Sequence, residues 1–463
     1  MTKNHVTLAN IQQLSAQGKY EEATQACLHF LQQHPYDAKA HNKLGALYFS
    51  QNAWQAAIDA YQAAIDLQPH YPDAYYNLAL TFNKLNRKEE ALHAYQALIE
   101  LAPQHIGGHF QAACLLMQRQ DYQAAIIHFL LVEQLDPTHF ENQFNLATAY
   151  LMIKQWQEAK SHYLQALAIQ TNDLQVLFNL GVISMQQGQV REAIAFYSRA
   201  IELNPDYHEA HHNLSIAYLE IKDRKKALNH FCEVLRILPN NEAVRHTIHI
   251  LKNEKNITAS PPEYIQTLFD SYADHYDSHL ETTLHYEVPR FIAEIVKKNC
   301  NLDNIQNVLD LGCGTGLCGV LFKEIAHSLT GVDISAKMLN VAAKKQIYDT
   351  LITAELLTFL LQKSSAFDLI IAGDVLVYFG ELDAIFAAID QALRSRSWFV
   401  FNTEISINQD YALTQTGRFI HSQDYIQQLA DKHHFTIIAQ QAIKMRTQER
   451  QTVNGFLYLL QKE

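Results

Sequence analysis

The sequence has little glycine and proline, few cysteines and no excess of basic residues. Only 15 glycines and 10 prolines occur among its 463 residues, which excludes a collagenous or low-complexity chain and favours a helix-rich one. The six cysteines form no CxxC pair, a pattern typical of free thiols in a reducing compartment rather than of a disulfide scaffold. With a net charge of −12, the chain lacks the basic footprint of proteins whose partner is a nucleic acid or a membrane surface.

Long apolar runs are also missing. No uninterrupted apolar stretch reaches the roughly 20 residues that a membrane span needs. Residues 1–14 lack the apolar core of a secretory signal peptide, so we expect a soluble protein of the cytoplasm. Hydrophobic residues make up 48% of the chain, enough for stable cores, and at roughly 150 residues per domain its length predicts about three domains or two large ones.

The first half of the chain repeats itself every 34 residues. One position of the repeat is always alanine, at Ala23, Ala57, Ala91, Ala125, Ala159, Ala193 and Ala227. Another is proline in every unit but one, at Pro35, Pro69, Pro103, Pro137, Pro205 and Pro239, with Thr171 in the remaining slot. Seven such units fill residues 4–241, and a fixed period of this length indicates a repeat architecture.

Each unit has the pattern of two amphipathic helices followed by a stop. In the second unit, Gly45 and Ala57 are small where two helices approach closely, and Tyr48 and Tyr61 fill the space beside them. Pro69 ends the second helix because proline has no backbone N–H. These positions resemble those of the tetratricopeptide repeat (TPR) family.

The TPR resemblance implies an all-α superhelix over residues 4–241, followed by a capping helix and linker over residues 242–260. The concave face of such arrays binds a peptide or protein segment, so we expect a protein partner there. An array that serves only for dimerisation or spacing is the alternative.

One segment of the repeats matches a zinc-binding pattern. Residues 208–212 have the form HExxH, in which two histidines on one helical face bind zinc. Residues 209–214, however, align with residues 73–78 of the third unit, so the repeat register already accounts for the segment. Since no third ligand is evident, we predict no metal site.

Residues 261–463 follow a Ser-Pro-Pro joint at 260–262 and alternate apolar strands with amphipathic helices. This alternation predicts a doubly wound, Rossmann-like α/β sheet. Seven strands are expected, near residues 306–311, 328–333, 350–353, 366–373, 396–403, 434–441 and 452–460. Because a loop rather than a helix joins the last two, we expect them to form a hairpin with one antiparallel member.

A glycine-rich turn follows the first predicted strand, with the sequence VLDLGCGTG over residues 308–316. Glycines permit a sharp turn and let a ligand approach the backbone at a helix N-terminus. In an open α/β sheet this turn lies at the carboxyl ends of the strands, where ligands bind. Gly314, Gly316 and Gly319 also satisfy the dinucleotide spacing GxGxxG, so a nicotinamide oxidoreductase is an alternative.

Three aspartates help to distinguish the alternatives. Asp310 lies within the end of the first strand, where its charge would repel a pyrophosphate group but suit an ammonium group. Asp333 ends the second strand, where a carboxylate can accept hydrogen bonds from both hydroxyls of a ribose. Asp374 follows the fourth strand and adds a third acid to the predicted cleft.

Together these segments resemble the class I S-adenosylmethionine-dependent methyltransferases, over residues 263–463. The resemblance implies a turn beneath the methionine part of the cofactor, formed by Gly312, Cys313, Gly314, Thr315 and Gly316. It also implies that Asp310 contacts the amino group, Asp333 the ribose, Ile334 and Met338 the adenine ring, and Glu355 the adenine amino group. Asp374 would face the sulfonium or the substrate.

Two further segments, residues 269–280 and 417–422, are similar to a bacterial group of predicted methyltransferases that carry TPR repeats. Tyr272 and Tyr276 are four residues apart, so we expect them on one face of a lid helix over the cofactor, with core packing as the alternative. If the reaction needs a general base, the candidates are His421, Asp374 and Glu404, although His421 also suits a capping or packing role.

The predicted function is an S-adenosylmethionine-dependent methyltransferase whose TPR array recruits a protein partner or the substrate itself. An interaction scaffold with a non-catalytic cofactor-binding domain is the alternative. Residues 373–376 lack the [DN]PP[YF] tetrapeptide, which argues against transfer to an adenine or glutamine amide nitrogen. The methyl acceptor stays open.

Overall fold

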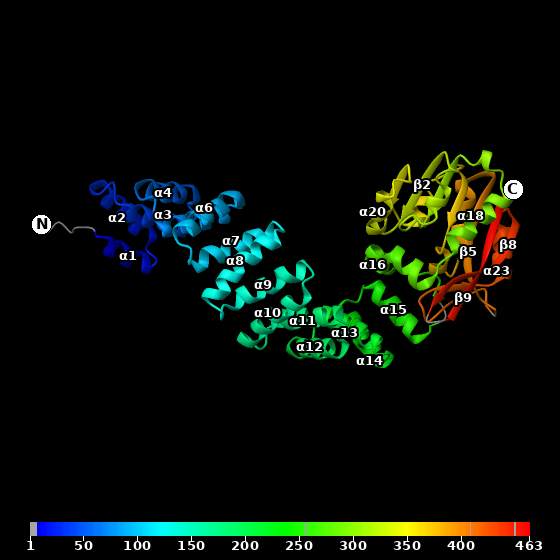
Figure 1. The fold of residues 1–463 in the computed structure, drawn as a ribbon, viewed down its shortest axis with the longest axis horizontal. Helices are drawn as coiled ribbons and strands as arrows, with labels where there is room; N and C mark the ends of the chain where they lie inside the picture. Colours follow the sequence, from blue (N-terminus) through cyan, green and yellow to red (C-terminus); the bar gives the residue numbers. More distant parts are fainter. Residues whose placement is uncertain (1–6, 255–256, 408, 449–450) are drawn as a thin grey trace. The chain divides into compact units, whose positions relative to one another are not determined.

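The computed structural model describes residues 7–254, 257–407, 409–448 and 451–463 (Figure 1). The chain divides into two compact units, Met1–Lys222 and Asp223–Glu463. The boundary between them falls inside the seventh predicted repeat. The domain boundaries that the repeat pattern indicates, at residues 241 and 260, therefore stay a prediction.

The described part of the first unit is helical. Its helices are α1 (Leu8–Ala16), α2 (Tyr20–Gln33), α3 (Ala38–Ser50), α4 (Trp54–Leu67), α5 (Pro72–Lys84), α6 (Lys88–Leu101), α7 (Ile106–Gln118), α8 (Tyr122–Leu135), α9 (Phe140–Met152), α10 (Trp156–Ile169), α11 (Leu174–Gln186), α12 (Val190–Leu203) and α13 (His208–Glu220). Each helix packs against the next along the chain. None of the described helices of either unit combines the length and apolar character that crossing a membrane requires.

The 34-residue period reappears in the geometry of the turns. Left-handed residues recur at this interval between paired helices: Asn52, Asn86, Gln120, Lys154, Gly188 and Lys222. Gly45 and Gly181 lie so close to the rings of Tyr61 and Tyr197 that a Cβ at either glycine would overlap the ring. The predicted close approach of paired helices is thus confirmed at Gly45, and Gly181 makes the same contact four repeats later.

Histidines have a structural role at the turns between repeats. Three have Nε2 about 3.0 Å from the carbonyl oxygen of the proline six residues earlier, in the pairs His41–Pro35, His109–Pro103 and His211–Pro205. Because a carbonyl oxygen only accepts, each Nε2 carries the proton and donates it. His211 belongs to the HExxH segment, so its position follows from the repeat.

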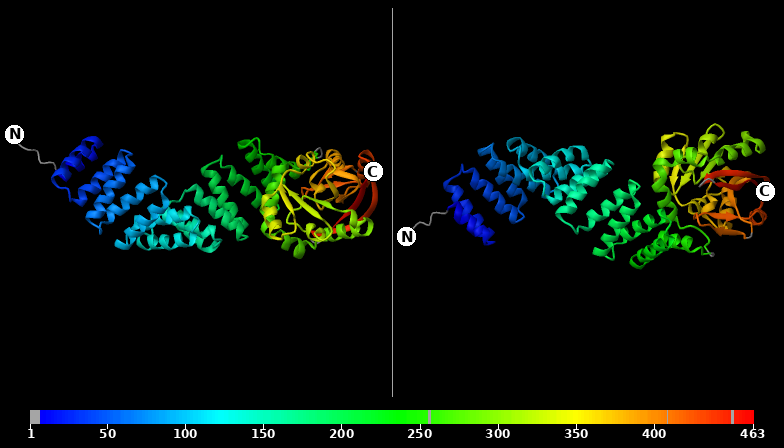
Figure 2. Two further views of the ribbon diagram at one scale, coloured as in Figure 1. Left: turned by 90° about the horizontal axis from the view of Figure 1, so that it is seen from above. Right: turned by 60° about the horizontal axis from the view of Figure 1, so that its bottom comes forward.

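The second unit contains a mixed sheet. Its strands are β1 (Asn307–Leu311), β2 (Ser328–Asp333), β3 (Thr350–Thr353), β4 (Phe367–Ala372), β5 (Leu393–Ile405), β6 (Tyr411–Leu413), β7 (Phe419–His421), β8 (Phe435–Gln448) and β9 (Gln451–Lys462). The order β3-β2-β1-β4-β5 is parallel throughout, and β9 pairs antiparallel with both β5 and β8. All seven predicted strands are present, and the last two form the expected hairpin, drawn in orange and red (Figure 2).

Two short strands were not predicted. Strands β6 and β7 pair antiparallel with each other, and β7 pairs parallel with the end of β5. Each has only three residues. A segment this short contains too few alternations of apolar and polar residues to indicate a strand.

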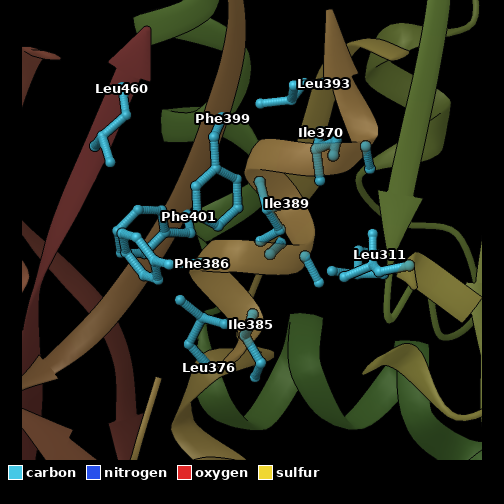
Figure 3. Close-up of a cluster of buried hydrophobic side chains, with 14 of the residues drawn as sticks. Leu311, Ile370, Leu376, Ile385, Phe386, Ile389, Leu393, Phe399, Phe401 and Leu460 are labelled. Carbon is cyan, nitrogen blue, oxygen red and sulfur yellow. The ribbon is translucent and has the colours of Figure 1, made fainter. Parts of the chain in front are cut away.

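Helices cover both faces of the sheet and complete two apolar cores. The helices of this unit are α14 (Arg224–Ile237), α15 (Glu242–Lys252), α16 (Pro262–Tyr272), α17 (Tyr276–Ser278), α18 (Val288–Asn299), α19 (Gly319–Phe322), α20 (Ala336–Lys344), α21 (Leu356–Leu360), α22 (Asp383–Ala392) and α23 (Gln423–Lys432). On one face, Phe386 of α22 packs with Phe399 and Phe401 of β5 (Figure 3). On the other, α18 and α19 cover the alternate strand residues. Because both faces are covered, a ligand has access at the carboxyl ends of the strands.

Candidate functional site

A cavity opens at the carboxyl ends of β1, β2 and β4, beside α16. Several of the predicted site residues line it: Gly312, Gly314, Asp333, Ile334, Glu355, Asp374 and Tyr276. A smaller second cavity shares Tyr276, Gly312 and Gly314 with the first and adds Asp310, Cys313 and Thr315. The structure therefore brings most of the predicted residues together around two neighbouring cavities that share part of their lining.

The glycine turn adopts a backbone that other residues rarely reach. Gly312 has φ = +67° and a Cβ there would lie 2.5 Å from the Val375 side chain. Gly314 has φ = +54°, but a Cβ there would meet no atom within 4 Å. Its open side faces the cavities that it lines. This turn thus leaves room for a ligand against the backbone. Gly316, with φ = +91°, lies against Tyr348 instead.

Asp333 has its carboxylate fixed by backbone donors. The Gly314 N–H donates to Oδ2 at 2.8 Å and the Ser335 N–H donates to Oδ1 at 2.9 Å. Burial raises the pKa of this carboxyl group, and the backbone donors oppose the rise. Each oxygen keeps a second lone pair, so the carboxylate can still accept two hydrogen bonds from a ligand.

Asp310 is almost completely buried at the end of β1. The Tyr348 hydroxyl donates to its Oδ2 at 2.6 Å. Burial raises the pKa of Asp310 to about 7, against the opposing effect of the Tyr348 hydrogen bond. No ion pair joins Asp310 to a basic side chain in the described part of the chain. A buried carboxylate in this state is suited to a cationic ligand group.

Asp374 belongs to a buried network of four charged side chains. Its carboxylate lies 2.9 Å from the guanidinium of Arg418 and 3.8 Å from that of Arg446, and both arginines also contact Glu404. Asn402 donates a further hydrogen bond to Asp374. Burial opposes ionisation, but Arg418 and Arg446 outweigh it and lower the pKa of Asp374. This carboxylate stays ionised and is therefore a poor proton acceptor.

His421 does not lie where a catalytic base should. It lines neither cavity, is 1% exposed, and has Nε2 2.8 Å from the carbonyl oxygen of Phe379 and 3.2 Å from that of Gly380. Burial lowers its pKa to about 4. The predicted role as a base is thus corrected: the ring ties β7 to the loop after β4.

The predicted aromatic lid involves a different residue. Tyr272 is 42% exposed, packs on His279 and lines neither cavity. Helix α16 ends at Tyr272 and a 3₁₀ turn follows, so the expected four-residue spacing on one helical face is lost. Phe269 lines the cavity instead, with its ring centroid 6.0 Å from that of Tyr276.

The structure places the three residues predicted to contact adenine, Ile334, Met338 and Glu355, in different surroundings. Met338 is fully buried in α20 and lines neither cavity, so the predicted contact with adenine is not supported, whereas Ile334 lines the larger cavity. Glu355 also lines that cavity, but its carboxylate accepts hydrogen bonds from the backbone N–H groups of Leu357 and Thr358 at the start of α21. Its contact with adenine stays a prediction.

Sequence patterns did not indicate that the linker before α16 lines the site. Ser260 lines the cavity, and its backbone N–H donates to the Tyr378 carbonyl oxygen at 2.9 Å. Its hydroxyl lies 3.1 Å from Nε2 of His246, which comes from α15. A single serine in a linker has no distinguishing pattern, so only the fold reveals this contact.

Two aspartates attach the segment around α16 to the turns that follow β1 and β2. Asp270 accepts a hydrogen bond from the Ser335 hydroxyl at 2.5 Å. Asp277 accepts one from the Thr315 hydroxyl and forms an ion pair with Lys345, whose Nζ lies 2.7 Å away. These contacts hold the segment against the glycine turn and the loop after β2.

Comparison with known families agrees with this architecture. A family model for a methyltransferase domain matches residues 308–396, and models for TPR repeats match residues 45–86, 72–105 and 175–207. The chain thus combines TPR repeats with a methyltransferase domain.

Two curated proteins are similar to parts of the chain. The biotin biosynthesis bifunctional protein BioHC of Saccharophagus degradans is 25% identical over 164 residues, which cover 34% of this chain and 26% of BioHC. The 18S rRNA (guanine-N(7))-methyltransferase RID2 of Arabidopsis thaliana is 41% identical over 49 residues, or 11% of this chain and 17% of RID2. The chain therefore spans about a quarter or less of these relatives.

Among solved structures, YrrB, described as a TPR protein with an unusual peptide-binding site, matches 41% of this chain and 97% of its own, with 22% identity and a TM-score of 0.39. The C-terminal part of a TPR repeat-containing protein from Cytophaga hutchinsonii matches 52% of this chain and 98% of its own, with 16% identity and a TM-score of 0.45.

Proposed function

We propose that this chain, which joins TPR repeats to a methyltransferase domain, transfers methyl groups from S-adenosylmethionine and uses its repeats to recruit a protein partner or substrate. The observation that carries the proposal is the carboxylate of Asp333, held by two backbone donors at the edge of a cavity that also exposes the open face of Gly314. The two hydroxyls of a ribose suit the Asp333 carboxylate, and the rest of a nucleoside ligand can lie against the backbone at Gly314.

The charges and shape of the two cavities suit this cofactor. Asp310 is a buried carboxylate that no described basic side chain neutralises, so it favours the ammonium group of an amino acid. Ile334 and Leu356 provide apolar contact beside the carboxylate of Asp333, which is the proposed ribose contact. Three acids and no lysine, arginine or histidine line the larger cavity, which favours a cationic cofactor over a pyrophosphate.

When bound, S-adenosylmethionine supplies an electrophilic methyl group on a positively charged sulfur, which is a good leaving group. The protein's own contribution is orientation and the exclusion of water. Asp333 would hold the ribose and Asp310 the amino group of the cofactor, while Phe269 and Tyr276 line the cavity beside them. Asp374 keeps a negative charge in the cavity because the cations Arg418 and Arg446 hold it ionised.

The cavity lining favours an acceptor that needs no enzymatic base. Asp374 is ion-paired, Asp333 and Glu355 accept backbone hydrogen bonds, and His421 lies outside the cavities. The acceptor atom therefore arrives without its proton.

Calorimetric titration with S-adenosylhomocysteine and NADPH tests the proposal. The wild-type chain should bind the first and not the second. Asp333→Ala should lower the affinity for S-adenosylhomocysteine at least about 100-fold, because it removes two charge-assisted hydrogen bonds. Asp333→Asn, which keeps the shape, should lose a smaller part, and the exposed Asp431→Ala should change nothing. Wild-type affinity in Asp333→Ala would refute the ribose assignment.

The same variant separates recruitment from transfer. Immobilised wild-type chain, given a cell extract and cofactor with a radiolabelled methyl group, should label a protein that it retains. Asp333→Ala should retain the same protein without labelling it. Equal labelling by both chains would contradict methyl transfer by this site.

A further inference from the structure

The smaller cavity contains a carboxylate with a single side-chain hydrogen-bond donor, Tyr348, beside the backbone N–H of Gly319. Asp310 lines this cavity, and burial leaves it 1% exposed. The titratable groups that act on it are the hydroxyl of Tyr348, the carboxyl of Asp333 and the thiols of Cys313 and Cys318. None of these groups is a cation, so hydrogen bonds from the Tyr348 hydroxyl and the Gly319 backbone, rather than an ion pair, stabilise its charged form within the protein.

Tyr348 reaches Asp310 from behind the glycine turn. Tyr348 lies two residues before the start of β3. Its side chain packs so close to Gly319 and Gly331 that a Cβ on either glycine would overlap it. This close packing leaves its hydroxyl directed at Asp310, to which it donates at 2.6 Å. Tyr348 lines neither cavity, so its contact with a ligand can only be indirect.

We propose that Tyr348 is a positioning residue for the cofactor: its hydroxyl holds the Asp310 carboxylate in the orientation and charge state that bind the ammonium group of the cofactor's amino-acid part. The proposal rests on the proposed function and adds to it a residue outside the recognisable methyltransferase motifs. Tyr348 also explains why residue 319 is glycine, since a Cβ there would overlap its ring and hydroxyl.

The charge state of Asp310 is finely balanced without a ligand. Burial raises its pKa to about 7, and the Tyr348 hydrogen bond acts in the opposite direction. Removing the hydroxyl should raise this pKa further, so that Asp310 is largely neutral at pH 7. A neutral Asp310 cannot pair with an ammonium group, and the affinity for the amino-acid part should fall.

The experiment compares two probes on wild type and Tyr348→Phe by calorimetry between pH 6 and pH 8.5. S-adenosylhomocysteine contains the amino-acid part, whereas 5′-methylthioadenosine lacks it. At pH 7, Tyr348→Phe should weaken the first about tenfold, the scale of one charge-assisted hydrogen bond, and leave the second unchanged. The loss for S-adenosylhomocysteine should shrink toward pH 8.5, where Asp310 ionises even without the tyrosine.

A matched variant, Tyr425→Phe, removes a hydroxyl outside both cavities, one that accepts a hydrogen bond from the Leu382 N–H. It should leave the affinities for both probes unchanged. An equal loss for both probes in Tyr348→Phe, or a loss that does not depend on pH, would mean that Tyr348 only packs and would overturn the inference. If wild type binds neither probe, the proposed function fails, and the inference with it; if wild type binds both and Tyr348→Phe matches it, only the inference fails.

Discussion

The two units of this chain place their charged side chains in different environments. In the repeat unit, ion pairs such as Arg119–Glu89 join exposed side chains, 44% and 70% accessible. In the α/β unit, the network of Asp374, Glu404 and Arg418 is buried beside the cavity. Exposed pairs contribute little because water solvates their partners when they separate, whereas buried partners have no such substitute.

The units also differ in whether a given side-chain contact recurs at equivalent positions or is made only once. The contact of a glycine with an aromatic ring is found at both Gly45 and Gly181, and the histidine–proline contact occurs in three repeats. In the α/β unit, each polar contact around the cavity is made once. The comparison teaches that the repeat unit is redundant, so single substitutions should be more damaging in the α/β unit.

The largest difference should come from breaking one ion pair in each unit. Arg418→Met leaves Asp374 and Glu404 buried with one fewer cation and should cost about 3–5 kcal/mol of stability in the α/β unit. Arg119→Ala should cost less than about 1 kcal/mol in the repeat unit. Urea unfolding measures both, with Trp398 as the fluorophore of the α/β unit and Trp54 and Trp156 as those of the repeat unit.

A double variant provides the control for this measurement. Arg418→Met combined with Glu404→Gln removes one charge of each sign and should recover part of the lost stability. If Arg418→Met and Arg119→Ala destabilise their units equally, the contrast between buried and exposed networks is wrong.

A smaller effect should follow from substituting one left-handed glycine in each unit. Gly312→Ala combines a strained backbone with overlap of the Val375 side chain and should cost roughly 3 kcal/mol. Gly188→Ala, with φ = +71° and no atom within 4 Å of a Cβ, should cost only about 1 kcal/mol. The same tryptophans report each transition. Equal losses would show that backbone strain alone decides the cost.

The smallest expected effect concerns acid stability. Burial lowers the pKa of His246 to about 4, below the roughly 6.5 of an unfolded histidine. The unfolded chain therefore binds the proton more readily, and the α/β unit should lose stability as the pH falls from about 6.5 toward 4.

His246→Gln should make the acid-induced loss less steep, as measured by urea unfolding at several pH values with Trp398 fluorescence. Part of the loss should remain, since burial lowers the pKa of His421 to about 4 as well. The exposed His70→Gln in the repeat unit should not change this slope. An unaltered slope in His246→Gln would contradict burial of the neutral ring as its cause.

Periodic patterns were the most dependable guide from sequence to fold. The 34-residue spacing predicted the paired helices, because each position of a unit meets the same neighbours in the next unit. Seven of the nine described strands were predicted because most of them are mainly apolar segments between turns. The glycine turn after β1 and the place of Asp333 at the end of β2 were also predicted, since a turn at a strand end depends on residues that are close in sequence.

Predictions failed where a side chain's direction depends on distant backbone. Tyr272 and Tyr276 were expected together in the lid, but only Tyr276 lines the cavity, and Phe269 of α16 lies beside it there. His421 was considered as a base, yet its ring meets the carbonyl oxygen of Phe379, 42 residues earlier. No local pattern records such contacts.

By itself, the sequence determined the repeat period, the order of strands along the chain and the chemistry of the turn after β1, because these features need only neighbours along the chain. The tertiary structure alone decided that Ser260 and Phe269 line the cavity, that Arg418 holds Asp374, and that Tyr348 holds Asp310. Each of these contacts depends on residues that are distant in the chain and meet only when strands and helices pack. Most polar groups that this packing buries then need a partner within the protein.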